Sequence, residues 1–302
     1  MATRRGVLLG GSAALASACA PAAKKGADLA GRFAALETTL DGGRLGVCAI
    51  DAGSGARLAH RGDERFAMAS TFKWLLAAVI LKAIDAGGMR LEQEIRYSQA
   101  DILANAPVAT AHLGEGGMTI AQLLEAIITV SDNTAANLLL SASQGPEGLT
   151  QFLRANRDDV TRLDRIEPEL NENAPDDPRD TTTPIAMAQT LRNILVGGDS
   201  LAGGQVLSLA SRDRLTGWME KTATGLKRVR AGFPANWRAG DKTGTGANGA
   251  LNDCVIAWPA TASGPARQPI VIASYISGGA AGPETREALH AEIGRLIAQA
   301  WG

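Results

Sequence analysis

The chain has 302 residues, 45% hydrophobic and 20% charged, which is enough apolar material for one large domain or two interlocked ones. Its 30 basic and 31 acidic residues leave a formal net charge of −1, which argues against a nucleic-acid-binding surface. The three histidines, His60, His112 and His290, are scattered without zinc-ligand spacing, so we expect no metal site.

The N-terminus has the features of an export signal. Arg4 and Arg5 directly precede an apolar run that ends near Ala20, which is typical of twin-arginine export, and the run is too short to span a bilayer. We therefore expect residues 1–20 to be a signal and the mature protein to be periplasmic. The residues before Cys19 resemble a lipoprotein cleavage box, which would place a lipid anchor on Cys19. The small residues around Cys19 also fit an ordinary signal-peptidase site.

The first part of the mature chain predicts a helix over residues 28–40 and two short strands, 45–50 and 56–60, around a glycine-rich turn. From Ser70 to about Leu215 the pattern is mainly helical. Further helices are predicted over residues 72–84, 120–130, 134–140, 146–155, 184–196 and 206–215.

Three short apolar segments near the C-terminus predict strands over residues 241–246, 251–260 and 269–277, and residues 283–301 predict a helix that covers the sheet. Strands from both ends of the chain imply a single sheet with a helical domain inserted into it.

The predicted sheet domain comprises residues 26–62 and 218–302, and the predicted helical domain comprises residues 63–217. The cleft between two such domains is a usual place for a small-molecule site. Cys48 and Cys254 lie in apolar strand-like segments, where a thiol behaves as a small hydrophobe, so we expect two free thiols.

A serine and a lysine, Ser70 and Lys73, stand three residues apart at the head of an apolar run. On a helix beginning at Ser70 they share a face, so the amine can take the proton of the hydroxyl. The helix N-terminus also favours the negative charge that develops in acyl transfer. Residues 72–84 are apolar on nearly every side, which indicates a buried central helix. On the order of one chance Ser-x-x-Lys is expected in such a chain, so the motif alone carries little weight.

Two more motifs supply polar groups. Ser131, Asp132 and Asn133 lie between helical stretches and offer a hydroxyl and a carboxamide. A helix N-cap is the alternative role for these residues, above all for Asp132. The Lys-Thr-Gly-Thr-Gly segment 242–246 follows a strand, and its small residues let a ligand approach backbone N–H groups that can bind an oxyanion. An ordinary edge-strand lysine is the alternative there. No motif contains a histidine, which leaves lysine or glutamate as the base.

In this order the motifs resemble those of the penicillin-recognising serine enzymes. The segment from Glu167 to Asn171 is similar to the class A β-lactamase segment whose glutamate activates the hydrolytic water. Arg165 and Asp180 resemble the ion pair that closes that family's Ω-shaped loop. The resemblance covers the chain after the signal. It implies an α/β (α+β) fold, with a five-stranded, mainly antiparallel sheet flanked by helices and an inserted all-α domain.

The resemblance makes Ser70 the nucleophile that opens a β-lactam ring, with its own N–H and that of Thr245 as the oxyanion hole. Lys73, Glu167 or both would accept the Ser70 proton. In the second step Glu167 and Asn171 would hold the water that attacks the acyl-enzyme.

The remaining roles concern the leaving group and substrate binding. By resemblance, Ser131 passes a proton to the lactam nitrogen and Asn133 binds the side-chain amide of the substrate. Lys242, Thr243 and Arg228 bind its carboxylate. The resemblance implies no cofactor, small-molecule β-lactams as the only partners, and a monomer.

Several positions depart from the family pattern. Many members place an arginine where Leu251 stands, and Arg228 resembles the alternative arginine of other members; the other interpretation makes Arg228 and Arg230 surface charges. Carbapenem-hydrolysing members have a disulfide between the positions of Ala69 and Gly246, which cannot form here.

At the mouth of the cleft Asn105 replaces a common aromatic residue and removes an apolar contact.

The leading hypothesis is an exported class A serine β-lactamase that hydrolyses penicillins and cephalosporins. The alternative is a peptidoglycan DD-peptidase or penicillin-binding protein, which shares the first three motifs. A separation of Glu167 from Ser70 by more than one bridging water would favour that alternative. A third hypothesis is a β-lactam sensor that keeps its acyl adduct. It is disfavoured because such sensors are usually membrane-embedded receptor domains, whereas this sequence predicts neither a membrane-spanning helix nor a partner module.

Overall fold

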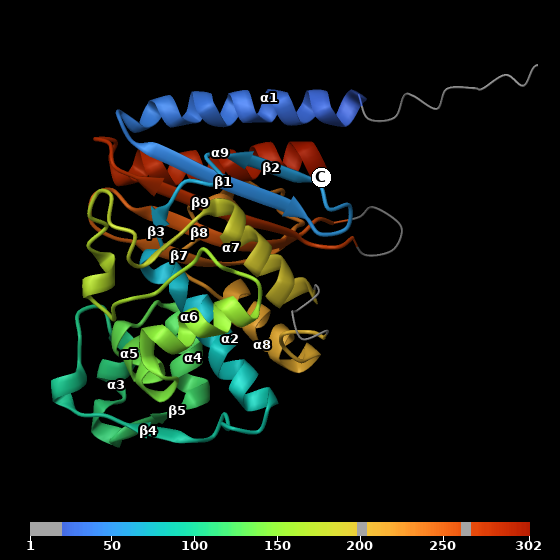
Figure 1. Ribbon diagram of the computed structural model, residues 1–302. Helices are drawn as coiled ribbons and strands as arrows, with labels where there is room; N and C mark the ends of the chain where they lie inside the picture. The colour runs from blue at the N-terminus through green and yellow to red at the C-terminus, as the bar shows by residue number, and fades with distance from the viewer. Residues whose placement is uncertain (1–19, 198–203, 261–266) are drawn as a thin grey trace, which may run out of the picture.

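The computed structural model describes residues 20–197, 204–260 and 267–302. Cys19 and the predicted signal up to that residue lie outside these ranges. Figure 1 shows one sheet with helices on both of its faces. Among the described helices, none is long and apolar enough to cross a membrane.

The sheet is assembled from the two ends of the chain, as predicted. Its strands are β1 (Arg44–Asp51), β2 (Arg57–His60), β7 (Arg238–Thr245), β8 (Leu251–Trp258) and β9 (Ile270–Ser277). They pair antiparallel in the order β2-β1-β9-β8-β7, so the last strand in the sequence lies beside the first. This confirms the predicted five-stranded antiparallel sheet, although β7 begins at Arg238 rather than at Asp241.

Both faces of the sheet are buried, because successive side chains of each strand point to opposite sides. In β1, Val47 and Ala49 enter the core beneath α1 (Ala20–Glu37) and α9 (Pro283–Trp301), whereas Cys48 enters the core shared with the helical block. Figure 1 shows α1 and α9 on one side of the sheet and the helical block on the other.

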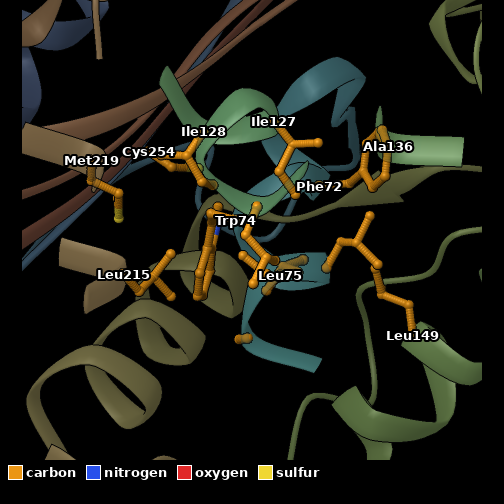
Figure 2. Close-up of a cluster of buried hydrophobic side chains, with 14 of the residues drawn as sticks. Phe72, Trp74, Leu75, Ile127, Ile128, Ala136, Leu149, Leu215, Met219 and Cys254 are labelled. Atoms are coloured by element: carbon orange, nitrogen blue, oxygen red, sulfur yellow. The ribbon is translucent and has the colours of Figure 1, made fainter. Parts of the chain in front are cut away.

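The helical block is built around α2 (Phe72–Asp85), which the apolar run predicted. Figure 2 shows Trp74 and Leu75 of this helix packed among side chains from its neighbours. The helix begins at Phe72, and Ser70 lies in a preceding 3-10 turn, Ala69–Thr71, rather than in the first α-helical turn as predicted. A tight 3-10 turn is a common way for a chain to enter an α-helix.

The other helices of the block are α4 (Ile120–Thr129), α5 (Asn133–Ala142), α6 (Gly145–Ala155), α7 (Pro184–Leu191) and α8 (Leu209–Glu220). A side chain caps the first turn of each of these helices except α6. Ser208 caps α8 by accepting from Ser211 N, so that helix begins and ends later than predicted. After Leu191 the chain continues as a π-helical turn to Gly197.

The smallest elements escaped prediction, because segments of two to five residues show no resolvable periodicity. They are α3 (Pro107–Ala111) and two small antiparallel sheets, β3 (Phe66–Ala67) with β6 (Thr181–Thr182) and β4 (Glu94–Arg96) with β5 (Gly117–Thr119). The two domain boundaries given above stay predictions.

The two described cysteines are free and buried, as expected. Burial raises the pKa of both Cys48 and Cys254 to about 12. Neither thiol therefore ionises near neutral pH, and both act as small apolar side chains.

Candidate active site

The nucleophile candidate Ser70 contacts two possible bases at once. Its Oγ accepts a hydrogen bond from Lys73 Nζ at 3.1 Å and donates to Glu167 Oε1 at 3.3 Å. Lys73 Nζ lies 2.9 Å from the same Glu167 oxygen. The side chains of Lys73 and Glu167 are almost completely buried. The geometry therefore brings the hydroxyl, the amine and the carboxylate together without choosing between the two bases.

Lys73 sits in a dense shell of acceptors at the start of α2. Its Nζ donates to Ser131 O at 2.8 Å and to Asn133 Oδ1 at 2.6 Å, in addition to Ser70 Oγ. Burial lowers the pKa of Lys73, although the nearby carboxylate of Glu167 acts in the opposite direction. A lysine with a lowered pKa is more readily neutral, and only the neutral amine can accept a proton.

Ser131 joins two amines. Its Oγ accepts from Lys242 Nζ at 3.0 Å and from Lys73 Nζ at 3.3 Å, and Lys242 Nζ also donates to Thr243 O at 2.7 Å. Burial, followed by the charge of Lys73, lowers the pKa of Lys242 well below its usual value. Ser131 has a left-handed backbone, φ +60°, which is uncommon for residues other than glycine and concentrates at functional sites. A continuous path for protons thus links the two lysines.

Glu167 is fixed from both sides of its loop. The side chain of Asn137 on α5 accepts from Glu167 N at 3.0 Å and donates to Glu167 O at 2.8 Å. Asn171 Nδ2 donates to Glu167 Oε2 at 2.5 Å, which leaves Oε1 directed at Ser70. The carboxylate therefore has one oxygen on the nucleophile and one on the predicted water-holding amide.

The predicted ion pair at the base of this loop is present. Arg165 Nε lies 2.6 Å from Asp180 Oδ2, and the other Asp180 oxygen accepts from the N–H groups of Asp164 and Arg165. Asp180 is only 1% exposed, so this multiply bonded carboxylate closes the loop in a water-poor environment.

Strand β7 approaches the nucleophile turn closely because Gly244 has no side chain. A Cβ there would lie 2.7 Å from Met68 O and 3.1 Å from Thr71 N. The close approach brings the next residue, Thr245, beside the turn that carries Ser70, where both backbone N–H groups are candidates for an oxyanion hole.

Comparison with known proteins decides among the hypotheses. The Beta-lactamase enzyme family matches residues 28–301. The chain is 46% identical to β-lactamase AST-1 of Nocardia asteroides, over 90% of this chain and 83% of that protein, and 44% identical to β-lactamase L2 of Stenotrophomonas maltophilia, over 87% and 83%. An ancestral (GNCA) class A β-lactamase structure matches with 52% identity and a TM-score of 0.84, covering 90% of this chain and 100% of that one. This chain belongs to the class A β-lactamase family.

Family membership confirms the resemblance and the fold expected from the four motifs. In this class A β-lactamase the predicted residues Ser70, Lys73, Ser131 and Glu167 are linked by direct hydrogen bonds or ion pairs. The other predicted site residues surround them: Asn133, Asn171, Arg228, Lys242, Thr243 and Thr245. Among the described residues, no group of three or more His, Cys, Asp or Glu is placed to hold a metal ion.

Arg228 is a buried side chain and not a surface charge. Its Nη1 donates to Gly244 O at 2.9 Å and Asn252 O at 2.7 Å, and its Nη2 donates to Thr245 Oγ1 at 2.8 Å. At 6% exposure it lies against the end of β7. Leu251, at the position of the missing arginine, is itself buried.

Arg230 is a structural residue and not a free surface charge. It donates to the carbonyls of Glu220, Ala239 and Thr222, and its Nε lies 3.4 Å from Asp241 Oδ2.

The remaining departures also have a structural description. A Cβ on Gly246 would lie 3.5 Å from Ala69 Cβ, within the range for a disulfide, although neither residue is a cysteine. Asn105 has φ +56°, donates from Nδ2 to Ser131 O at 3.1 Å and accepts from Asn133 N at 3.0 Å. Asn105 therefore supports the loop of Ser131, a role that sequence analysis did not foresee.

Sequence analysis missed two asparagines and left a third residue open. Asn137 positions Glu167, and Asn252 Nδ2 ties β8 to the nucleophile turn through Ala67 O and Met68 O. Both interrupt apolar segments, and this signal could have identified them because a buried amide must find hydrogen-bond partners. Asp132 is the helix cap of the alternative interpretation, since its Oδ1 accepts from Ala135 N.

Proposed function

We propose that this class A β-lactamase hydrolyses penicillins and cephalosporins in two steps, through an acyl-enzyme on Ser70, and thereby confers resistance. The observation that carries the proposal is the position of Glu167, with Oε1 3.3 Å from Ser70 Oγ and Oε2 on Asn171. A general base must lie within hydrogen-bond reach of its proton, directly or through one water, and Glu167 meets that requirement.

In the first step Ser70 Oγ attacks the lactam carbonyl carbon. Its proton passes to the neutral amine of Lys73 or to the carboxylate of Glu167, and the N–H groups of Ser70 and Thr245 stabilise the oxyanion. The C–N bond then breaks, and Ser131 Oγ gives its proton to the nitrogen. The Ser131 hydroxyl regains a proton from the lysines that it contacts.

In the second step Glu167 and Asn171 hold a water against the ester. Glu167 takes a proton from the water while the water oxygen bonds to the carbonyl carbon. The bond between that carbon and Ser70 Oγ then breaks, and Glu167 returns the proton to Ser70 Oγ. General-base help of this kind typically contributes ~10²–10⁴ in rate.

Substrate recognition relies on charge. Lys242, Thr243 and Arg228 converge at the end of β7 and would bind the carboxylate of the substrate. Asn133, between Lys73 and Ala104 O, would bind its side-chain amide.

The direct contact between Ser70 and Glu167 disfavours the DD-peptidase alternative. A DD-peptidase would share the Ser-x-x-Lys, Ser-Asp-Asn and Lys-Thr-Gly motifs. It would lack the segment from Glu167 to Asn171, whose base activates a water for attack on the acyl-enzyme. The Glu167 and Asn171 pair supplies that base, so hydrolysis and not lasting acylation is the outcome that this arrangement supports.

We also propose that the protein is exported through the twin-arginine pathway, acts in the periplasm as a monomer, and has Cys19 as a candidate lipid-attachment site. Arg4, Arg5 and the apolar run after them support export. Intact mass of the mature protein from the periplasmic fraction tests the location, the cleavage site and lipidation together.

The function is tested by a time course of intact mass during reaction with excess penicillin, read beside the loss of β-lactam absorbance. We expect many turnovers with little adduct in the unmodified enzyme. Ser70→Ala should abolish turnover, and Glu167→Gln should trap a stoichiometric acyl-enzyme. Appreciable hydrolysis by Ser70→Ala would remove Ser70 from the mechanism, and a lasting adduct on the unmodified enzyme would indicate a DD-peptidase or a sensor.

A further inference from the structure

Two asparagines join the loop that carries Glu167 to the turn between β7 and β8. Asn173 Nδ2 donates to Ala247 O at 3.0 Å and to Asn248 O at 3.2 Å. In return, Asn248 Nδ2 donates to Asn173 O at 3.0 Å and to Glu172 O at 3.2 Å. We call Asn173 and Asn248 the asparagine clasp. Its bonds are reciprocal, so each side chain satisfies carbonyls of the opposite segment.

The backbone of both residues is adapted to this contact. Asn173 has φ +46° and Asn248 has φ +47°, in the left-handed region that asparagine tolerates better than most other side chains. A left-handed residue other than glycine persists when its surroundings hold it in place. Here the surroundings are the carbonyls of the partner segment, so the two turns and the clasp stabilise one another.

Residues 171–179 of this loop depend on such polar contacts because they do not pack onto a core. A cavity of about 750 Å³ lies behind the loop, and its lining combines charged side chains such as Arg44, Glu64 and Asp177 with apolar ones such as Phe66. None of residues 171–179 is fully buried, and Leu170 is the last apolar anchor before them. Burial of apolar surface therefore contributes little to the position of this segment, and its hydrogen bonds decide it.

The clasp lies next to the catalytic machinery. Asn171 O accepts from Ala247 N at 2.8 Å, and Asn171 Nδ2 donates to Glu167 Oε2. Asn171 is thus held by the β7–β8 turn on its backbone side and holds Glu167 on its side-chain side. Ser70 and Lys73, in contrast, are fixed by α2 and by the loop of Ser131, which the clasp does not contact.

We propose that Asn173 and Asn248 are positioning residues for deacylation, which keep Asn171, and through it Glu167, in register with the strand that carries the oxyanion hole. The inference rests on the proposed function of Glu167. In a two-step mechanism kcat/KM reports acylation alone, whereas slow deacylation lowers kcat and KM together. Loss of the clasp should therefore lower kcat more than kcat/KM and let the acyl-enzyme accumulate.

The test uses Asn173→Gly and Asn248→Gly, because glycine keeps the left-handed backbone and removes only the amide. We expect kcat to fall ~10-fold or more, as small misplacements of catalytic groups do, with a parallel fall in KM and a visible acyl-enzyme in the mass time course. The double variant should be worse than either single one, because each single variant leaves the two hydrogen bonds of the other asparagine in place. Gln144→Gly is the matched control. Gln144 likewise has a left-handed backbone, with φ +67°, but it precedes α6 outside the site. It should leave kcat and KM unchanged.

A second variant separates the donor from the shape of the side chain. Asn173→Asp removes the Nδ2 donor and faces Ala247 O and Asn248 O with a carboxylate, so it should impair kcat at least as much as glycine does. Clasp variants with unchanged kcat and no accumulated adduct would overturn the inference, as would equal losses in kcat and kcat/KM, which would assign the clasp to acylation. Glu167→Gln, run beside them, keeps the two proposals distinct, because failure to trap its acyl-enzyme would overturn the proposed function itself.

Discussion

Arg228 illustrates how one side chain serves the strand and the substrate site together. Two of its hydrogen bonds hold the carbonyls of Gly244 and Asn252, on adjacent strands, and a third reaches Thr245 Oγ1. Burial lowers the pKa of Arg228, yet an arginine stays protonated in proteins, so a fixed positive charge lies beside the predicted carboxylate-binding residues.

Replacing Arg228 with alanine should raise KM for carboxylate-bearing β-lactams. Loss of a charge-assisted hydrogen bond typically costs about 1.5–3 kcal/mol, which corresponds to a KM change of ~10- to 100-fold. Steady-state kinetics measure this change, with Arg238→Ala as a control because that arginine is exposed at the opposite end of β7. Unchanged kinetics would make Arg228 a bystander.

At the scale of elements, the close packing of β7 against the turn that carries Ser70 depends on Gly244, which has no side chain. The strand, the turn and β8 meet at Gly244 and Asn252, and the amide of Asn252 bonds to the carbonyls of Ala67 and Met68. Both candidates for the oxyanion hole, the N–H groups of Ser70 and Thr245, come from segments held by this contact, so activity and stability should respond together when it is disturbed.

Gly244→Ala should destabilise the fold by about 1–3 kcal/mol and reduce acylation, because its Cβ would lie 2.7 Å from a backbone oxygen and push β7 away. Urea unfolding and kcat/KM measure the two effects. Gly217→Ala is the control: Gly217 lies within α8 with open space at its Cβ position, so alanine should be neutral or stabilise by up to about 1 kcal/mol. A neutral Gly244→Ala would show that the strand can shift without loss.

At the scale of the whole molecule, Glu37 connects the first helix to the sheet. It is the last residue of α1, and its carboxylate accepts from Leu45 N on β1, from both Arg61 Nε and Nη2, and contacts His60 on β2. Hydrogen bonding to Arg61 is the main cause that lowers the pKa of Glu37 to about 2.

This shift predicts a pH-dependent contribution to stability. Because the pKa is lower in the folded state, the contribution is complete above about pH 4.5 and is lost as the pH falls towards 2. Arg61 is partly exposed and water screens the pair, so the expected size is on the order of 1 kcal/mol. Unfolding of the unmodified protein and of Glu37→Gln at several pH values should show a difference that disappears in acid. A difference that is as large below about pH 2 as at neutral pH would mean that the contribution does not come from the charge.

The amino-acid sequence by itself determined the long elements and the chemistry. The periodicity of residues 283–301 matches α9 residue for residue, and the apolar run after Ser70 predicted the buried α2. Local patterns report such features because helices and strands repeat within a few residues. Ser70 and Lys73 were predicted from their spacing, and Glu167 was predicted from the resemblance of its segment to that of the family.

Only the tertiary structure decided how the parts meet. Asn252 bonds to Ala67 across 185 positions, and Asn248 bonds to Asn173 across 75. Its place in an apolar segment marks Asn252 as a buried amide but does not identify its partner, and nothing near Asn173 or Asn248 in the sequence distinguishes them from other polar side chains. The sequence likewise leaves open whether Arg228 is buried or exposed. Long-range partners depend on strand order and on the packing of distant segments, so the supports of the site become visible only when the chain has folded around them.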